Sequence, residues 1–276
     1  MTELRAVPDR AKGVVNPAAA KQAFRLGRYL PETDLAGVID HFWLVEWALP
    51  EGVTHVQRTL PYPCVHLVFD LGRTAIFGPT SGIFEYTLQG SGTVLGVRFR
   101  AGGFRGFMDE KVQTITDRVL PLQPLFDCDA AEGERQVFAH GDDGGKVAAA
   151  SALVRRVLPA PDPQVSKIEA ILNLIKDHPD ITQVQALSER ACISVRSLQL
   201  LFADYVGLSP KWAIRRNRVH DAADQLANGS DVDLASLAQS LGYYDQAHFS
   251  SDFEHLVGQP PAEYRRKCQL SVATGQ

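Results

Sequence analysis

The chain of 276 residues predicts an α+β protein, in which an N-terminal β-barrel with covering helices precedes an all-helical C-terminal domain. Three observations lead to this fold class. Short β-rich segments separated by Gly and Pro fill residues 35–99. A proline-rich stretch at residues 159–163 divides the chain, and an internal repeat spans residues 182–261. Together with a hydrophobic content of 45%, this length accommodates two domains with cores of their own.

These features set the expected domain boundaries. Residues 1–29 carry little pattern, and we expect an arm there with a short helix at residues 18–26. The remaining expected units are a first domain at 30–158, a stiff proline-rich linker at 159–164, a second domain at 165–268 and a tail at 269–276.

The first domain begins with alternating and aromatic segments typical of strands. Gly and Pro pairs separate them, which favours a barrel or a sandwich. Beyond residue 104 the pattern becomes mainly helical, with an extended segment at 116–122 that returns to the barrel and helices at 130–140 and 146–158. Two roles for these helices stay open, since they could cover the barrel or pair two subunits. The expected strands are at residues 41–47, 53–60, 64–70, 74–77, 83–88 and 93–100.

The repeat in the second domain predicts two helix-turn-helix units. Residues 186–210 and 237–261 follow one plan, and at a constant offset Leu198 aligns with Phe249 and Gly207 with Gly258. In each copy a short apolar helix ends in a tight turn, and a second helix begins at a polar cap and stops at glycine. We expect the caps at Ser194 and at residues 244–245, and a long helix at 210–228 that joins the two units.

A second helix presented in this way fits the major groove of DNA, where its outward N-terminal residues can reach base edges. Two such helices on one rigid frame could enter successive grooves about 34 Å apart. The alternatives are a plain helical bundle for the domain and a solvated helix face for each side chain; His248 could also simply partner Asp245. The predicted base contacts are Arg196, Ser197, Gln199 and Leu200 in the first unit, and Gln246, Ala247, His248 and Ser251 in the second.

These motifs resemble the AraC/XylS family of bacterial transcription regulators. The similarity covers residues 165–267 and includes ISVRSLQLLF, GLSP, LAQSLGYYDQAHFSSDF and GQPPAEYRR. It implies sequence-specific binding to double-stranded DNA, with RNA polymerase as a further candidate partner. Members often carry Arg at the positions of Leu200 and Ser251, so this chain departs from the family at two contact positions. Leu200 could instead touch a thymine methyl group or pack inward.

Charge argues in the opposite direction. The whole chain has a net charge of −4, and residues 165–276 contain eleven Lys and Arg against thirteen Asp and Glu. DNA binding normally needs a basic surface. Cationic side chains nevertheless gather after the first unit, although a solvated helix face would explain them equally well. The predicted phosphate contacts are Ser194, Lys211, Arg215, Arg216 and Arg218.

The N-terminal half is similar to the sensor region of a subgroup of AraC-like regulators. LPYPCVHLVFD, FGPT and VLGVRFRAGGF carry this resemblance over residues 30–125, and it implies a cupin-like barrel that senses a small molecule or a partner. Candidate pocket residues combine aromatic and polar groups, as ligand sites commonly do, but they could equally fill the core. They are Trp43, Tyr62, His66, Phe69 and Arg98.

No catalytic arrangement stands out, and we expect neither a metal nor a cofactor. His55 and His66 lack the dense spacing of a metal motif and would need the distant Glu85 as a third ligand. The four widely spaced cysteines form no C-x-x-C pair and suit a reducing cytoplasm, and we expect no membrane segment.

The leading hypothesis is therefore a cytoplasmic DNA-binding regulator, controlled by a small-molecule effector or a partner at its first domain. It could act as a monomer or a homodimer. The alternative hypothesis, favoured by the acidic balance and the two missing arginines, is a cupin-like enzyme or metal-binding protein whose helical half is a vestigial interaction module.

Overall fold

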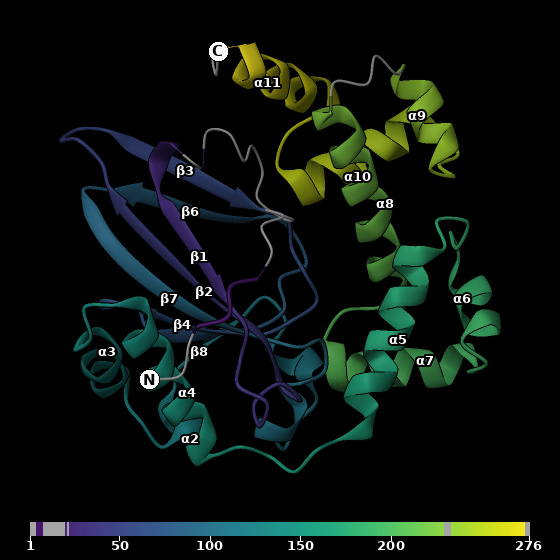
Figure 1. Ribbon diagram of the computed structural model, residues 1–276. Helices are drawn as coiled ribbons and strands as arrows, with labels where there is room; N and C mark the ends of the chain where they lie inside the picture. Colours follow the sequence, from purple (N-terminus) through teal and green to yellow (C-terminus); the bar gives the residue numbers. More distant parts are fainter. Residues whose placement is uncertain (1–3, 8–19, 21, 229–232, 274–276) are drawn as a thin grey trace.

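The computed structural model describes residues 4–7, 20, 22–228 and 233–273, which form a β-rich part followed by an all-helical part. Figure 1 shows the sheets beside the helical part, with helix α8 (Pro210–Ala227) running between two groups of shorter helices. Two buried hydrophobic clusters follow the same division, one in each part. The prediction of an antiparallel β region followed by an all-α region is therefore confirmed. None of the helices in the described part of the chain is both long and apolar enough to cross a membrane.

A six-stranded antiparallel sheet is the main element of the N-terminal part. Its strands lie in the order β1-β2-β7-β4-β5-β8, and the long pair β2 and β7 forms its centre. The strands are β1 (Arg25–Tyr29), β2 (Ile39–Ala48), β4 (His66–Asp70), β5 (Ala75–Phe77), β7 (Ser91–Phe99) and β8 (Val119–Leu120).

Strand β1 lies inside the segment that we predicted as an arm. It pairs with β2, and Val7 donates its N–H to the carbonyl of Arg28, so residues 4–7 run along the outer edge of this strand. Strand formation here covers an edge that would otherwise expose unpaired backbone groups. Most of the predicted arm, and with it part of the helix expected at residues 18–26, falls outside the described residues.

The expected closed barrel is not found among the described strands. Strands β3 (Thr54–Thr59) and β6 (Phe84–Gln89) pair only with each other and form a separate two-stranded ribbon. Pro61 and Pro63 lie between β3 and β4. Because proline cannot donate a backbone hydrogen bond, this segment cannot continue the ladder from the ribbon into the main sheet.

Helices cover one face of the main sheet. Phe42, Leu44 and Phe99 point from the sheet into the same buried cluster as Val137 of α3 (Ala130–Phe138) and Leu153 of α4 (Asp143–Arg156). Of the two roles left open for these helices, the structure shows packing against the sheet. The short segments α2 (Gln123–Phe126), η1 (Arg105–Phe107) and η2 (Val112–Ile115) complete the same core.

On the opposite face, two glycines of β7 make room for indole rings. A Cβ at Gly96 would lie 2.0 Å from Cε2 of Trp43, and one at Gly92 would lie 2.3 Å from Cζ2 of Trp47. Each indole comes from the residue directly opposite its glycine across the β2–β7 pair. The missing side chains thus let both tryptophans lie flat on the sheet.

Substitution of Gly96 by Ala should therefore destabilise the N-terminal part. The added methyl group overlaps the Trp43 ring, and forced repacking of this kind costs about 1–3 kcal/mol. Gly37→Ala is the matched control, because its Cβ would meet no atom within 4 Å. Urea unfolding should show a lower midpoint for Gly96→Ala than for Gly37→Ala, and equal midpoints would contradict the packing described.

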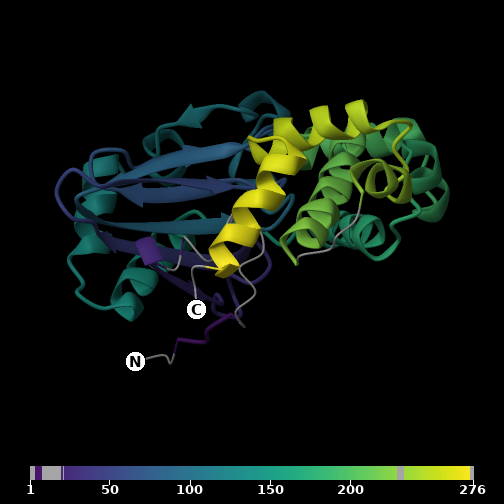
Figure 2. The same cartoon turned by 90° about the horizontal axis from the view of Figure 1, so that it is seen from above.

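The helical part is built around one continuous core. Leu198 and Phe202 from the first half and Phe249 and Phe253 from the second belong to a single buried cluster that also includes Ile214 of α8. Viewed from above, the last helix lies on the side of the other helices that faces the sheets (Figure 2). The helices are α5 (Pro163–Asp177), α6 (Val184–Arg190), α7 (Val195–Leu201), α8 (Pro210–Ala227), α9 (Leu234–Ser240), α10 (Gln246–Val257) and α11 (Pro261–Ala273), and a π-helical turn, η3 (Phe202–Val206), extends α7.

Candidate nucleic-acid interface

The two helix-turn-helix units have the same local architecture. In the first, α6 ends at Arg190; Cys192, two residues further on, has φ 53°, and Ile193 donates its N–H to the carbonyl of Ser188 at 3.1 Å. In the second, α9 ends before Gly242, which has φ 75°, and Tyr243 donates to Ala238 at 2.9 Å. A left-handed residue followed by a backward hydrogen bond closes the first helix of each unit and redirects the chain.

Both second helices begin at a polar cap. The hydroxyl of Ser194 accepts from the N–H of Ser197 at 3.1 Å, and the Asp245 carboxylate accepts from the N–H of His248 at 2.7 Å. At their far ends, Gly207 (φ 82°) and Gly258 (φ 78°) terminate the helices in the left-handed conformation. The sequence prediction of these caps and stops is thus confirmed, because each depends on residues that are near one another in the chain.

The predicted base contacts all lie on open surface. Leu198 and Phe249 turn into the core, whereas the neighbouring positions on each helix point outward. Leu200 is 51% exposed, so it does not pack inward. His248 is also exposed, although its imidazole lies 3.8 Å from the carboxylate of Asp252. The exposed set is Arg196, Ser197, Gln199, Leu200, Gln246, Ala247, His248 and Ser251.

The predicted phosphate contacts are less uniform. Ser194 and Lys211 are exposed. Arg215 forms an ion pair with Asp252 at 3.3 Å. The guanidinium of Arg218 lies 3.6 Å from the centre of the Tyr243 ring, and its Nε donates to the carbonyl of Leu241 at 2.6 Å. Arg218 thus stabilises the turn of the second unit.

Arg216 lies at the contact between the two parts of the protein. Its Nε donates to the carbonyl of Pro61 at 2.9 Å, and its guanidinium lies 5.1 Å from the centre of the Tyr62 ring. Burial, together with the nearby positive charge of Arg98, lowers the pKa of Arg216 to about 10. In this arrangement Arg216 faces the β-rich part, and its role as a phosphate contact stays a prediction.

Further contacts join the β-rich part to α8 and to the ends of both units. Trp212, one helical turn before Arg216, donates from its indole to the carbonyl of Ser81 at 2.7 Å. The hydroxyl of Thr116 donates to the carbonyl of Gly207 at 2.8 Å. At the second unit, a Cβ on Gly258 would lie 2.8 Å from a methyl group of Ile83. The two glycine stops therefore both pack against the β-rich part.

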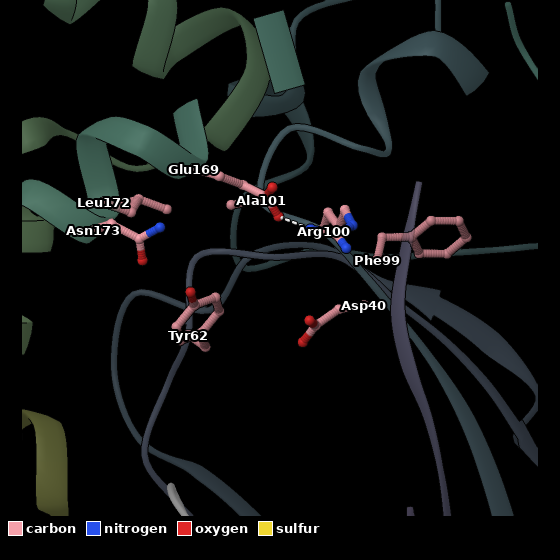
Figure 3. A pocket seen from close by; sticks show the side chains of 8 residues that line it. All are labelled: Asp40, Tyr62, Phe99, Arg100, Ala101, Glu169, Leu172 and Asn173. Carbon is pink, nitrogen blue, oxygen red and sulfur yellow. Dashed lines mark hydrogen bonds and ion pairs between the residues drawn. The ribbon is translucent and has the colours of Figure 1, made fainter. Parts of the chain in front are cut away.

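A cavity of about 220 Å³ lies at the same contact, between the end of the sheet and α5 (Figure 3). Arg100 joins the two sides of the cavity. Its guanidinium pairs with Glu169 of α5, and its Nε donates to the carbonyl of Ala36 at 2.6 Å. The lining is mainly polar, and comprises Asp40, Tyr62, Phe99, Arg100, Ala101, Glu169, Leu172 and Asn173.

Of the residues predicted for a ligand pocket, only Tyr62 lines this cavity. Arg98 lies next to it, with its guanidinium 4.0 Å from the centre of the Tyr62 ring and its Nε 3.3 Å from Asp40. Phe69 has a different role, because it is fully buried in the core beneath the helices. Sequence reasoning missed Asp40, Arg100, Glu169 and Asn173. The alternation of Arg98 and Arg100 with Phe99 is a signal that could have pointed to Arg100, whereas Glu169 and Asn173 come from a helix distant in the sequence.

His66 and Trp43 form a polar cluster beside Arg98. The indole of Trp43 donates to Nδ1 of His66 at 3.2 Å, and Nε2 of His66 lies 3.3 Å from the Cys64 sulfur. Burial, reinforced by the charges of Arg98 and His41, lowers the pKa of His66 to about 3. His66 is therefore neutral at physiological pH, which leaves Nδ1 free to accept from Trp43.

His55, the other histidine considered for a metal, lies on the ribbon with Nε2 3.3 Å from the side-chain oxygen of Gln57. In the described ranges, no group of three or more His, Cys, Asp or Glu side chains could hold a metal ion.

Comparison with known proteins identifies the helical part. Residues 187–267 match the family described as "Helix-turn-helix domain". Segments that make up 37% to 40% of this chain align with curated relatives. One of these relatives is an AraC-like transcription regulator of Streptomyces lividans, which is 34% identical over 105 residues. The C-terminal region is an AraC-type helix-turn-helix domain. The Streptomyces alignment covers 38% of this chain and 34% of the relative, so the chain spans about a third of that protein's length.

Other matches agree with the AraC-type domain or concern the β-rich part. The arabinose operon regulatory protein of Escherichia coli K12 is 25% identical over 113 residues, which cover 40% of this chain and 38% of that protein. Residues 27–121 match a family described as a domain of unknown function (DUF6597). The solved structure of ToxT from Vibrio cholerae aligns with 88% of this chain and 98% of its own, at 11% identity and a TM-score of 0.39. Nothing is transferred from a score this low.

The lowered pKa of His66 predicts acid sensitivity. Below pH 6.5 the unfolded chain takes up a proton at this imidazole, but the folded protein does not do so until about pH 3. Stability should therefore fall as pH decreases through this window, by at most about 1.4 kcal/mol per pH unit. Urea unfolding at pH 7 and pH 5 should show a larger loss for the wild type than for His66→Gln. His55→Gln, on the ribbon, should lose as much as the wild type, and an equal loss for all three proteins would contradict the assignment.

Proposed function

We propose that this protein is a sequence-specific DNA-binding transcriptional regulator that reads DNA with α7 and α10. The observation that carries the proposal is the pair of capped second helices, each with an exposed N-terminal face, on one continuous core. Helices presented in this way reach base edges through the major groove. The names of the aligned relatives, which describe transcription and operon regulators, support the same function.

The rigidity of the helical core supports reading by both units at once. α8 contributes Ile214, Val219 and Ala222 to the core shared by the two units. A fixed frame of this kind favours a binding site with two halves about one helical turn of DNA apart, roughly 34 Å. The proposed base contacts are the exposed residues of α7 and α10 named above, with Arg196 and Gln199 as the principal ones in the first unit.

The charge distribution favours binding that depends modestly on salt. Arg215 is paired with Asp252, and Arg218 is engaged with the second turn. The proposed backbone contacts are therefore led by Lys211 and Ser194, which are exposed near the first unit. Because Arg215, Arg216 and Arg218 already have partners within the protein, affinity should fall less steeply with salt than for a protein in which all these cations meet phosphates.

The contact between the two parts suggests how an effector would act. A small molecule in the cavity would touch Tyr62 and Asn173, which come from opposite sides of the contact. Such a ligand changes the equilibrium between arrangements of the two parts only by its differential affinity for them. We therefore propose effector control through this contact, where Arg100 and Glu169 already join the sheet to α5.

Selection from a random duplex library tests the proposed function directly. The purified full chain is mixed with the library at low and at near-physiological salt, and the bound DNA is sequenced. Enrichment of a motif with two halves about one helical turn apart supports the proposal. Absence of enrichment at both salt concentrations would refute it.

Arg196→Ala should reduce the affinity for the selected duplex and relax the preference at one base position. Loss of a base contact costs about 1–3 kcal/mol, which corresponds to about 5- to 150-fold in Kd. Arg135→Ala on α3, an exposed arginine of the β-rich part, is the matched control and should bind as the wild type does. Fluorescence anisotropy with the selected duplex and its single-base variants measures both effects, and an equal loss on all sequences would exclude a base contact.

Lys211→Ala should instead weaken binding to every duplex. Removal of one phosphate contact lowers the slope of log Kd against log salt by about 1. Lys111→Ala, an exposed lysine of the β-rich part, serves as the control and should leave the slope unchanged. A salt titration with the selected and the random duplex distinguishes the two, and an unchanged slope for Lys211→Ala would remove this residue from the interface.

A further inference from the structure

The turns of the two helix-turn-helix units differ by one residue. In the first helix of each unit, Ser188 corresponds to Ala238, because each carbonyl accepts the N–H that the turn donates back to the helix. These two residues are 50 positions apart. In the second helices, the cap Ser194 corresponds to the cap Asp245, a separation of 51 positions. The second turn therefore contains one residue that has no counterpart in the first.

That additional residue is Tyr244. Tyr243 corresponds to Ile193, since both donate their N–H back to the first helix, and Asp245 already caps α10. Tyr244 is 96% exposed, whereas Tyr243 beside it is 6% exposed. Full exposure leaves the whole phenol ring in water, although burial of aromatic surface is normally favourable. Tyr244 would therefore contribute to binding when another molecule contacts its ring and its hydroxyl.

The turn that presents Tyr244 is held from several sides. The ring of Tyr243 packs edge-on against His248 and Phe249, each with a centroid separation of 5.4 Å. On the helix behind the turn, the guanidinium of Arg218 lies over the same Tyr243 ring and donates to the carbonyl of Leu241. Because these contacts fix the residues on both sides, Tyr244 projects from an ordered turn, and its backbone loses little further freedom when a partner binds.

The position of Tyr244 is next to the proposed reading face. It directly precedes the Asp245 cap, and the exposed Gln246, Ala247 and His248 form the first turn of α10. When the first turn of a helix enters the major groove, the residue before its cap lies toward the groove edge, where the phosphates are. Tyrosine hydroxyls are common donors to DNA phosphates.

We propose that Tyr244 donates its phenol O–H to a backbone phosphate beside the half-site read by α10, a contact that the first unit lacks. This inference rests on the proposed function. With this contact, the second unit binds the DNA backbone through one side chain that has no counterpart in the first unit. The contact would strengthen backbone binding beside a unit where Arg215 and Arg218 already have partners in the protein, because a hydrogen bond to a charged group contributes more than one between neutral groups.

Anisotropy titrations of the full chain with the selected duplex and with the random duplex pool test the inference. Tyr244→Phe, which removes only the hydroxyl, should weaken binding to both about tenfold, as expected for a lost hydrogen bond to a charged acceptor. Since tyrosine is neutral, the salt slope should stay that of the wild type. Leu71→Ala, which shortens a side chain of the β-rich part that is 66% exposed, is the control for an exposed substitution away from the interface and should change nothing.

A second readout separates direct contact from a structural effect. Ethylation of DNA phosphates should interfere with wild-type binding at one phosphate beside the second half-site, and this interference should disappear with Tyr244→Phe. The thermal midpoint of the variant should equal that of the wild type, because the side chain contacts so little of the protein. Loss of affinity accompanied by a lower midpoint would overturn the inference.

The outcomes also distinguish this inference from the function on which it rests. If the wild type binds duplex DNA and Tyr244→Phe binds equally well, the phosphate contact is refuted and the proposed function stands. If the wild type binds neither duplex at low salt, the proposed function is refuted, and the contact with it.

Discussion

The packing of α8 is the constraint on which the rest of the structure depends. One side of this helix contributes Ile214, Val219 and Ala222 to the core of both helix-turn-helix units. Another side carries Trp212 and Arg216, one turn apart, to Ser81 and Pro61 of the β-rich part. The same helix thus fixes the relative position of the two units and attaches both to the β-rich part. A change in how α8 packs would alter both relations together.

The contact along α8 is more polar than a typical core. Two arginines, Arg98 and Arg216, lie over the ring of Tyr62, and Asp40 pairs with Arg98. Burial, together with the positive charge of Arg98, lowers the pKa of Arg216, so the charge of Arg216 reduces the stability of this contact. A polar contact of this kind is compatible with the effector control proposed above, because a ligand at the contact could shift the equilibrium between arrangements of the two parts.

The two repeats share a plan but present different surfaces. Each has a left-handed turn residue, a polar cap and a glycine stop, so local hydrogen bonding determines the path of the backbone in both. The surfaces differ because Leu200 lies on the second helix of the first unit where Ser251 lies on that of the second, and because Tyr244 extends only the second turn. Duplication therefore supplies the frame, and single exposed residues make the units distinct. This division is expected when stability resides in the shared core and recognition at the surface.

The sequence by itself determined the elements whose signals are local. These signals depend on neighbours within a few residues, as in the cap Ser194, the stop Gly207 and the apolar spacing of Leu198 and Phe202. They were sufficient to predict the AraC-type domain and its exposed faces. Only the tertiary structure decided that the strands form a sheet and a ribbon instead of a closed barrel, because strand pairing joins distant segments. It also decided the different contacts of Arg216 and Arg218, which lie two positions apart in one basic cluster. Arg216 faces the β-rich part, and Arg218 stabilises the turn of the second unit. Helical periodicity separates such neighbours by 200°, and only the packed domains determine what each direction meets.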